Sequence, residues 1–186
     1  KLDPLHAGYK ATLAGILYYA GNDHAAIQKA REALQLDPEH FLAVNFLVLA
    51  YTDTNDTAAL ASLLDSISPA MQELAEIKSN VARGYAVMGD QAKARKIYDD
   101  LVASSDSLTP MALLNTAGLA ITLGEINEGV ALLERLEKSG SWIQFWSKLM
   151  HLKYSAIRDD PRYQSLLKRM GLDDASVEAL NKEMSF

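Results

Sequence analysis

The chain has 186 residues, 49% of them hydrophobic and 23% charged, which is the balance of a globular protein with a sizeable core. Its formal net charge of −6 argues against a general affinity for nucleic acid, because phosphate binding needs clustered Lys and Arg. There is no cysteine, and no apolar run approaches the ~18 residues that cross a bilayer, so disulfides, thiolate chemistry and membrane insertion are not expected.

Amphipathic segments follow one another in pairs along the chain. The spacing of their apolar residues predicts four helix pairs, at residues 6–20 with 23–36, 39–53 with 56–67, 70–88 with 90–103, and 109–123 with 126–138. A ninth helix is predicted from about residue 141, and two short helices are predicted at about 160–170 and 174–184. No strand pattern occurs, so the sequence predicts an all-α fold.

Each pair is divided by a residue that can adopt the left-handed conformation in which helices end. These residues recur at spacings of 34, 34 and 35 and are Gly21, Asn55, Gly89 and Gly124. Five positions further on, where the two helices of a pair cross closely, the residues are mostly small: Ala26, Leu60, Ala94 and Gly129. Because Leu60 is large, we expect the second pair to be splayed or repacked there.

The prolines give an independent indication of helix starts. All five follow a residue that can cap a helix: Asp3-Pro4, Asp37-Pro38, Ser68-Pro69, Thr109-Pro110 and Asp160-Pro161. A capping residue followed by proline is typical of the first turn of a helix, so each proline predicts one. The first residues also match the stretch 34 positions later, Leu-Asp-Pro-x-His in both, and therefore look like the end of an earlier unit.

This helix–turn–helix unit of about 34 residues resembles the tetratricopeptide repeat (TPR). The match is best in the first and third units, "LAGILYYAGNDHAAIQKAREALQLDP" and "VARGYAVMGDQAKARKIYDDL". The resemblance implies a right-handed α-solenoid of antiparallel helix pairs with a C-terminal helical cap. We therefore expect one domain over residues 1–186, with repeats at about 7–38, 41–69, 75–106 and 110–139 and capping helices at 141–186.

The tail, "LKYSAIRDDPRYQSLLKRMGL", is not a repeat. It resembles the closing segment of TPR domains in large bacterial signalling proteins, which carry the array behind a winged-helix DNA-binding, adenylate cyclase or kinase domain. The matching residues are Ile157, Arg158, Asp160, Pro161, Arg162, Tyr163, Leu166, Leu167, Met170, Gly171 and Leu172. The resemblance implies that the chain is a fragment of a longer protein, with an effector domain before Lys1.

In the TPR family, one face of the first helix of each pair lines the concave side of the solenoid. The residues that the resemblance places there are Tyr18, Tyr19, Asn45, Phe46, Leu49, Asn80, Arg83, Met111 and Asn115. The three asparagines, spaced 35 and 35, could hydrogen-bond to the backbone of an extended peptide. Tyr and Phe would supply apolar anchors, and Arg83 could pair with a carboxylate. The alternative is that these are ordinary solvated or inter-repeat residues.

Family members that clamp the C-terminal carboxylate of chaperones use several Lys, Arg and Asn residues. The corresponding positions here are Gly8, Ala11, Gly15, Glu76 and Asn80, so that clamp is largely absent. An aromatic stripe is formed by Trp142, Phe145 and Trp146. It could be an exposed partner site or the seal on the open end of the last repeat, since a solenoid needs a cap.

The sequence predicts neither an enzyme nor a cofactor or metal site. Asp159 and Asp160 are adjacent and do not converge on one substrate, so we expect Asp160 to cap a helix. The four histidines, His6, His24, His40 and His151, show no i, i+4 pairing. A glycine-rich phosphate loop and a nucleophile elbow are also missing from the sequence.

Two functions remain open. The first is a protein- or peptide-binding TPR scaffold, the regulatory or sensory portion of a longer bacterial signalling or transcription-regulatory protein. The second is a self-assembly module that forms a homodimer through its end caps or convex faces. A cytoplasmic location is favoured and a periplasmic one stays open, because a chain without cysteine tolerates both reducing and oxidising surroundings.

Overall fold

The computed structural model describes residues 6–139, 155–176 and 178–179. Within these ranges the chain forms helices and no strand, so the all-α prediction is confirmed. The α-helices are α1 Ala7–Tyr19, α2 Asp23–Leu36, α3 Phe41–Asp53, α4 Thr57–Ser66, α5 Pro69–Gln72, α6 Ala75–Val87, α7 Gln91–Ala103, α8 Pro110–Thr122, α9 Ile126–Lys138 and α11 Pro161–Arg169. Two 3₁₀ turns are η1 Ser105–Ser107 and η2 Ser155–Ile157. Residues 174–176 and 178–179 are also helical, within the helix predicted at about 174–184.

The turns inside the helix pairs have the backbone conformation that the sequence predicts. Gly21, Gly89 and Gly124 have positive φ, and so does Asn55, at 56°. In each turn the next residue donates its N–H to a carbonyl in the last turn of the first helix, as Asn22 does to Leu17 at 2.9 Å. This bond closes a Schellman motif and satisfies a carbonyl that the helix end would leave without a partner. The four turns therefore set the 34-residue period of the fold.

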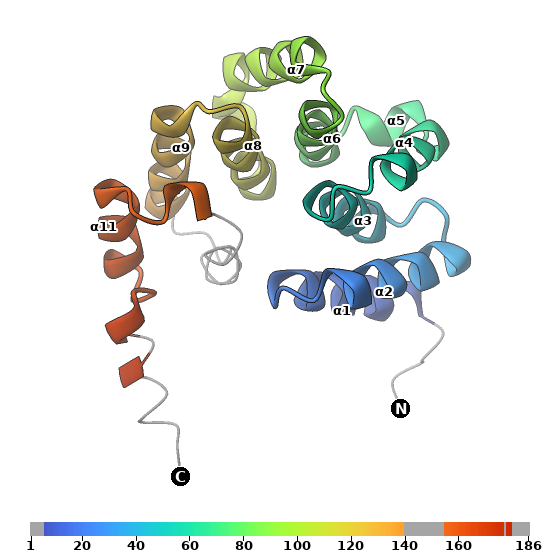
Figure 1. The fold of residues 1–186 in the computed structure, drawn as a ribbon, viewed down its shortest axis with the longest axis horizontal. Coiled ribbons are helices and arrows are strands. Elements are labelled where there is room, and N and C mark those ends of the chain that lie inside the picture. The colour runs from blue at the N-terminus through green and yellow to red at the C-terminus, as the bar shows by residue number, and fades with distance from the viewer. Residues whose placement is uncertain (1–5, 140–154, 177, 180–186) are drawn as a thin grey trace.

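The pairs follow one another around an arc (Figure 1). The first helices α1, α3, α6 and α8 pack each against the next and lie on its inner side, with α4, α7 and α9 outside them. Helices with neighbours on several sides are buried all round: residues 43–52 of α3 and residues 112–121 of α8 are all buried. The described part of the chain is therefore an α-solenoid of antiparallel helix pairs.

The proline prediction is confirmed at three positions and wrong at one. Ser68, Thr109 and Asp160 each cap a helix whose first residue is proline. Pro38 instead lies in a turn, and α3 begins three residues later at Phe41. Pro4 lies outside the described residues.

The predicted helix 70–88 is divided in two. α5 ends at Gln72, Leu74 takes an extended backbone (φ −64°, ψ 126°), and α6 begins at Ala75. The break places the Gln72 side-chain amide where it donates to the carbonyls of Leu64 and Ile67, at 3.2 and 3.0 Å. These carbonyls lie at the end of α4, so a side chain satisfies acceptors that the helix itself cannot.

The second unit is repacked at Leu60, as expected. Leu60 is fully buried and lies against Gly84 of α6, in the next unit. A Cβ atom added to Gly84 would stand 2.9 Å from Leu60 Cδ2. A large residue in α4 is thus accommodated by the absence of a side chain in α6.

Ala94 lies on α7, which crosses and packs against α6, and its side chain is fully buried. We expect Ala94→Leu to overpack this crossing and lower the free energy of unfolding by roughly 1–3 kcal/mol. Ala92→Leu is the matched control, because Ala92 is exposed on the same helix. Urea denaturation followed by circular dichroism measures both variants. An unchanged midpoint for Ala94→Leu would contradict the packing.

α11 covers part of the last unit. Tyr163, Leu166 and Leu167 are buried in the same hydrophobic cluster as Val130 and Leu133 of α9. At the edge of this contact, Arg169 donates to both carboxylate oxygens of Glu137, at 2.9 and 2.8 Å. The remaining part of the predicted cap, with Trp142, Phe145 and Trp146, lies outside the described residues.

Candidate functional site

The nine residues predicted for the concave face come from the four first helices, which stack side by side along the inner side of the arc. Arg83 is largely covered, with 13% of its side chain exposed, and Met111 is half-buried. The other seven are buried: Tyr18, Tyr19, Asn45, Phe46, Leu49, Asn80 and Asn115. The structure therefore brings the predicted residues together, and most of them pack against other residues of this same chain instead of facing solvent.

The three asparagines contact one another across three units. Asn80 Nδ2 donates to Asn45 Oδ1 at 2.8 Å, and Asn115 Nδ2 donates to the same oxygen at 3.4 Å and to the Glu76 carbonyl at 3.0 Å. Among the described residues, Asn80 Oδ1 has no hydrogen-bond partner although it is buried. Of the two roles weighed for these amides, inter-repeat contact is the one that they have in this structure.

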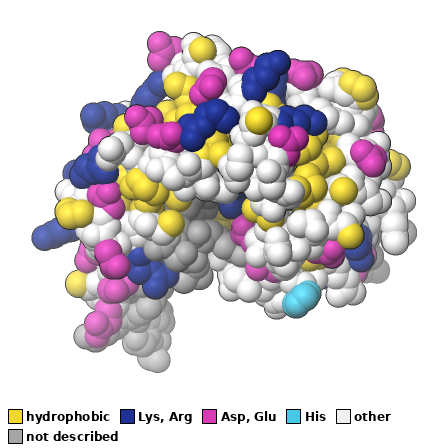
Figure 2. Space-filling model, turned by 45° about the horizontal axis from the view of Figure 1, so that its top comes forward, with side chains coloured by type: hydrophobic (Ala, Val, Ile, Leu, Met, Phe, Trp, Pro, Cys, Tyr) yellow, Lys and Arg dark blue, Asp and Glu magenta, His cyan; other side chains and the backbone are white. Residues whose placement is uncertain are grey.

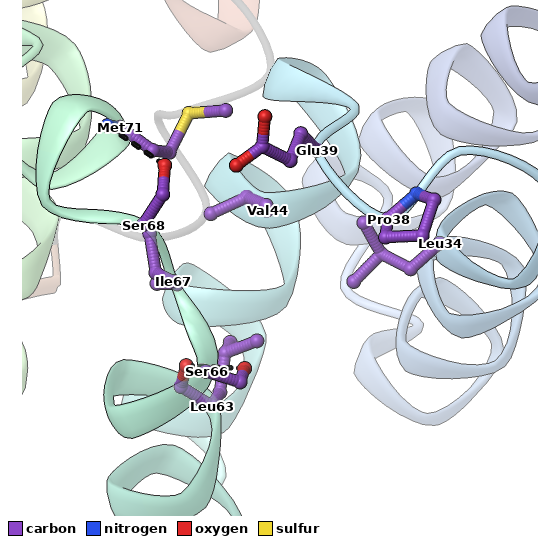
Figure 3. Close-up of a pocket in the computed structure, with 9 residues that line it drawn as sticks. All are labelled: Leu34, Pro38, Glu39, Val44, Leu63, Ser66, Ile67, Ser68 and Met71. Atoms are coloured by element: carbon purple, nitrogen blue, oxygen red, sulfur yellow. Dashed lines mark hydrogen bonds between the residues drawn. The ribbon is translucent and has the colours of Figure 1, made fainter.

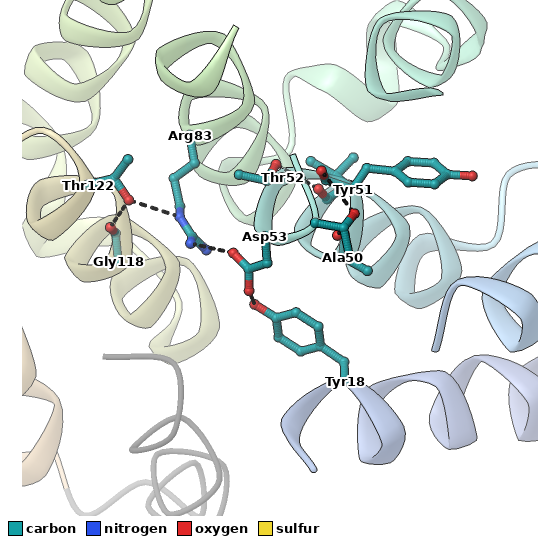
Figure 4. Close-up of polar contacts among 10 residues, drawn as sticks. Tyr18, Ala50, Tyr51, Thr52, Asp53, Arg83, Gly118 and Thr122 are labelled. Atoms are coloured by element: carbon teal, nitrogen blue, oxygen red, sulfur yellow. Dashed lines mark hydrogen bonds and ion pairs between the residues drawn. The ribbon is translucent and has the colours of Figure 1, made fainter. Parts of the chain in front are cut away.

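A second series of polar contacts crosses all four units (Figure 4). The Tyr18 hydroxyl donates to Asp53 Oδ2 at 2.8 Å, and Arg83 Nη2 donates to Asp53 Oδ1 at 3.1 Å. Arg83 Nε then donates to Thr122 Oγ1 at 3.2 Å, and the Thr122 hydroxyl donates to the Gly118 carbonyl at 2.9 Å. We call these contacts the Tyr18–Thr122 chain. The carboxylate that pairs with Arg83 is thus Asp53 of this protein.

Sequence reasoning missed Asp53 and Thr122. Both lie two residues before the turn residue of their unit, where the first and third units have Tyr19 and Val87. A comparison of this position across units would have shown the polar pair. No periodic signal links Asp53 to Arg83, because they occupy different positions in their units.

Aromatic rings fill the junction of α1 and α3. Tyr19 and Phe46 meet edge to face with ring centroids 5.6 Å apart, and Tyr18 and Phe46 are 6.0 Å apart. A Cβ atom on Gly15 would stand 2.5 Å from the Phe46 ring, so the ring lies directly on the α1 backbone. Burial raises the pKa of both tyrosines well above the usual value, and the charge of Asp53 raises the pKa of Tyr18 further. Both phenols are therefore neutral at physiological pH.

A small cavity lies between the α2–α3 turn and the end of α4 (Figure 3). Its volume is about 40 Å³ and its lining is mostly apolar, with Leu34, Val44, Leu63 and Met71 among the residues. Such a volume holds about one water molecule and no organic cofactor.

The acidic pair in the tail has a structural role at one position. Asp160 accepts hydrogen bonds from the backbone N–H and the guanidinium of Arg162, which lower the pKa of its carboxyl to about 2. The prediction that Asp160 caps a helix is confirmed.

In the described ranges, no three His, Asp or Glu side chains are grouped so that they could hold a metal ion. No helix in those ranges is long and apolar enough to cross a membrane.

Comparison with protein-family models gives no match, and comparison with curated proteins gives none either. A solved structure with similarity to this chain carries the description "Functional Characterization of Pseudomonas Aeruginosa pilF". It is 17% identical, and the similarity covers 97% of this chain and 83% of that one, with a TM-score of 0.49.

Proposed function

We propose that this protein is a non-catalytic scaffold that binds a protein or peptide partner on the inner face of its arc. The observation that supports the proposal is that hydrogen bonds between side chains link this face from one unit to the next. The asparagine contacts and the Tyr18–Thr122 chain join the first helices of successive units by hydrogen bonds. A face held in one shape loses little conformational entropy on binding, which favours affinity for an extended partner.

The nine predicted residues divide into two roles under this proposal. Buried residues such as Asn80 and Phe46 hold the shape of the inner face. Met111, which is half-buried at the start of α8, offers an apolar anchor to the partner.

Charge insertion at Met111 tests the proposal. A photo-crosslinking residue at Met111 first identifies the partner, and calorimetry then measures its affinity. We expect Met111→Glu to weaken binding at least about tenfold, since hot-spot anchor residues contribute about 2 kcal/mol or more each. Val102→Glu on the outer helix α7 is the control, because Val102 is an exposed apolar residue away from the inner face. Full affinity in Met111→Glu, or an equal loss in both variants, would contradict binding on the inner face.

The wider context is also a proposal. We infer that the chain is the regulatory or sensory portion of a longer bacterial signalling or transcription-regulatory protein. The support is the resemblance of residues 157–172 to the closing segment of such domains. The complete reading frame of the gene tests it, because the inference requires an effector domain before Lys1.

One surface favours self-assembly as a second function. Tyr9, Leu13 and Ile16 form a stripe along α1 and are 50%, 41% and 49% exposed. The residues 34 positions later in α3, Ala43, Leu47 and Ala50, are buried. The same face that is covered in α3 is thus open in α1, and a second copy of the chain could cover it. Sedimentation tests this function, because Leu13→Glu should convert a dimer into monomers.

A further inference from the structure

Two grooves in the same repeat register lie over α3 and α6, beside the second helices of their units. The α3–α4 groove is lined by Arg31, Leu47, Tyr51, Ala59, Ser62, Leu63 and Ser66 and has a volume of about 280 Å³. The α6–α7 groove has a volume of about 300 Å³ and is lined by Gln72, Glu73, Lys78, Val81, Tyr85, Lys93, Lys96, Ile97 and Asp100. Six residues of the first groove have a counterpart in the second 34 positions later, from Leu47 and Val81 to Ser66 and Asp100.

In the first groove, a side chain of the protein itself lies over the tyrosine ring. Arg31 of α2 donates to the Tyr51 hydroxyl at 2.7 Å, and its guanidinium lies 5.5 Å from the centre of the Tyr51 ring. The residue at the related position of the second unit is Asp65, which does not line the α6–α7 groove. The tyrosine of that groove, Tyr85, therefore has no arginine over it from the preceding unit.

The second groove also differs in charge. Lys93 and Lys96 stand where the first groove has Ala59 and Ser62, both uncharged. Lys93 Nζ lies 3.8 Å from the centre of the Tyr85 ring, and Lys96 is exposed. Figure 2, which brings the α7 side of the arc forward, shows Lys and Arg side chains beside hydrophobic ones on this face.

The balance of charge in the groove is positive although the chain carries −6. Lys78 is neutralised by Glu73, which accepts its hydrogen bond at 2.9 Å. Of the other charged residues that line the groove, Lys93 and Lys96 are cationic and Asp100 is anionic. Beneath these charges lie Val81 and Ile97, so the groove combines an apolar floor with a cationic edge.

We propose that the α6–α7 groove binds an acidic peptide segment. A carboxylate of the peptide pairs with Lys93 and Lys96, and a neighbouring apolar side chain packs on Val81 and Ile97. The volume suits one or two side chains. Glu73 and Asp100 at the rim disfavour a polyphosphate backbone, which would be repelled along its length. This surface is separate from the inner face, so the inference does not depend on the function proposed above.

The test uses a short fluorescein-labelled peptide of alternating glutamate and leucine, with fluorescence anisotropy as the readout. We expect Lys93→Glu/Lys96→Glu to weaken binding about tenfold or more, because two attractive pairs become repulsive. Lys138→Glu/Lys168→Glu changes the net charge equally at exposed positions on α9 and α11, and it should bind as the unaltered protein does. Binding should also weaken when salt is raised from about 0.05 M to about 0.5 M.

Three results would overturn the inference: no binding by the unaltered protein, equal losses in the two double variants, or equal affinity for a peptide with glutamine in place of glutamate. Met111→Glu, which tests the inner face, should leave the affinity of this peptide unchanged. A result that contradicts peptide binding in the α6–α7 groove can therefore be distinguished from one that contradicts partner binding on the inner face.

Discussion

Replacing Phe46 with alanine should lower the free energy of unfolding by about 3–5 kcal/mol, the largest effect that we expect from one substitution. The Phe46 ring is buried between Tyr18 and Tyr19 and lies on the backbone of α1 at Gly15. Alanine would leave a cavity at the junction of the first two units, and neighbours held by the α1 and α3 backbones cannot fill it fully. Guanidinium denaturation followed by circular dichroism measures the loss.

Ile16→Ala is the control for Phe46→Ala, because it also removes an apolar side chain, here from α1. The Ile16 side chain is half exposed, so we expect a change of less than ~1 kcal/mol. Equal losses in the two variants would contradict the packing of the ring. Retention of full stability by Phe46→Ala would place the ring at an open surface instead.

The second large effect should follow from Asn80→Asp. Asn80 is fully buried, and its amide nitrogen donates to Asn45 Oδ1. An aspartate there would place a carboxylate against that oxygen without a donor between them. Breaking a buried polar contact in this way costs about 3–5 kcal/mol at neutral pH.

The cost of Asn80→Asp should depend on pH in a definite direction. Burial raises the pKa of a carboxyl group, so the folded variant would hold a proton that the unfolded chain releases near pH ~4. Raising the pH above this value then favours the unfolded state, and the deficit relative to the unaltered protein should grow. Asn80→Ala is the control, because its loss should not vary with pH. A deficit for Asn80→Asp that is constant from about pH 4 to pH 7 would contradict the burial.

The period of the fold was predictable because its signals are local. A residue that tolerates positive φ can be recognised at its own position, and Asn55 and the three turn glycines all have this conformation. The division of the predicted helix 70–88 was not predictable. It depends on Gln72 reaching carbonyls of α4, and this contact exists only after the two helices have packed.

The sequence predicted which face of the first helices carries the candidate site residues, but not that most of them are buried against other residues. The resemblance places Asn45, Asn80 and Asn115 on one face of the first helices, and that face does bring them together. How closely successive first helices approach decides whether such side chains face solvent or one another. That distance depends on packing between residues about 35 positions apart, of which the periodicity carries no record. Asp53 was missed because its position in the unit was not compared across the repeats.

The contact of Leu60 with Gly84 has a consequence for how the protein can change. The two residues belong to different units, so neither unit is complete in itself: one carries the protrusion and the next carries the recess. A duplication, deletion or exchange of either unit that keeps the 34-residue register would still give at least one of these residues a different neighbour. It would set Leu60 against a unit with a side chain at that position, or leave Gly84 facing a gap. The units share a length, but at this junction their order along the chain is fixed.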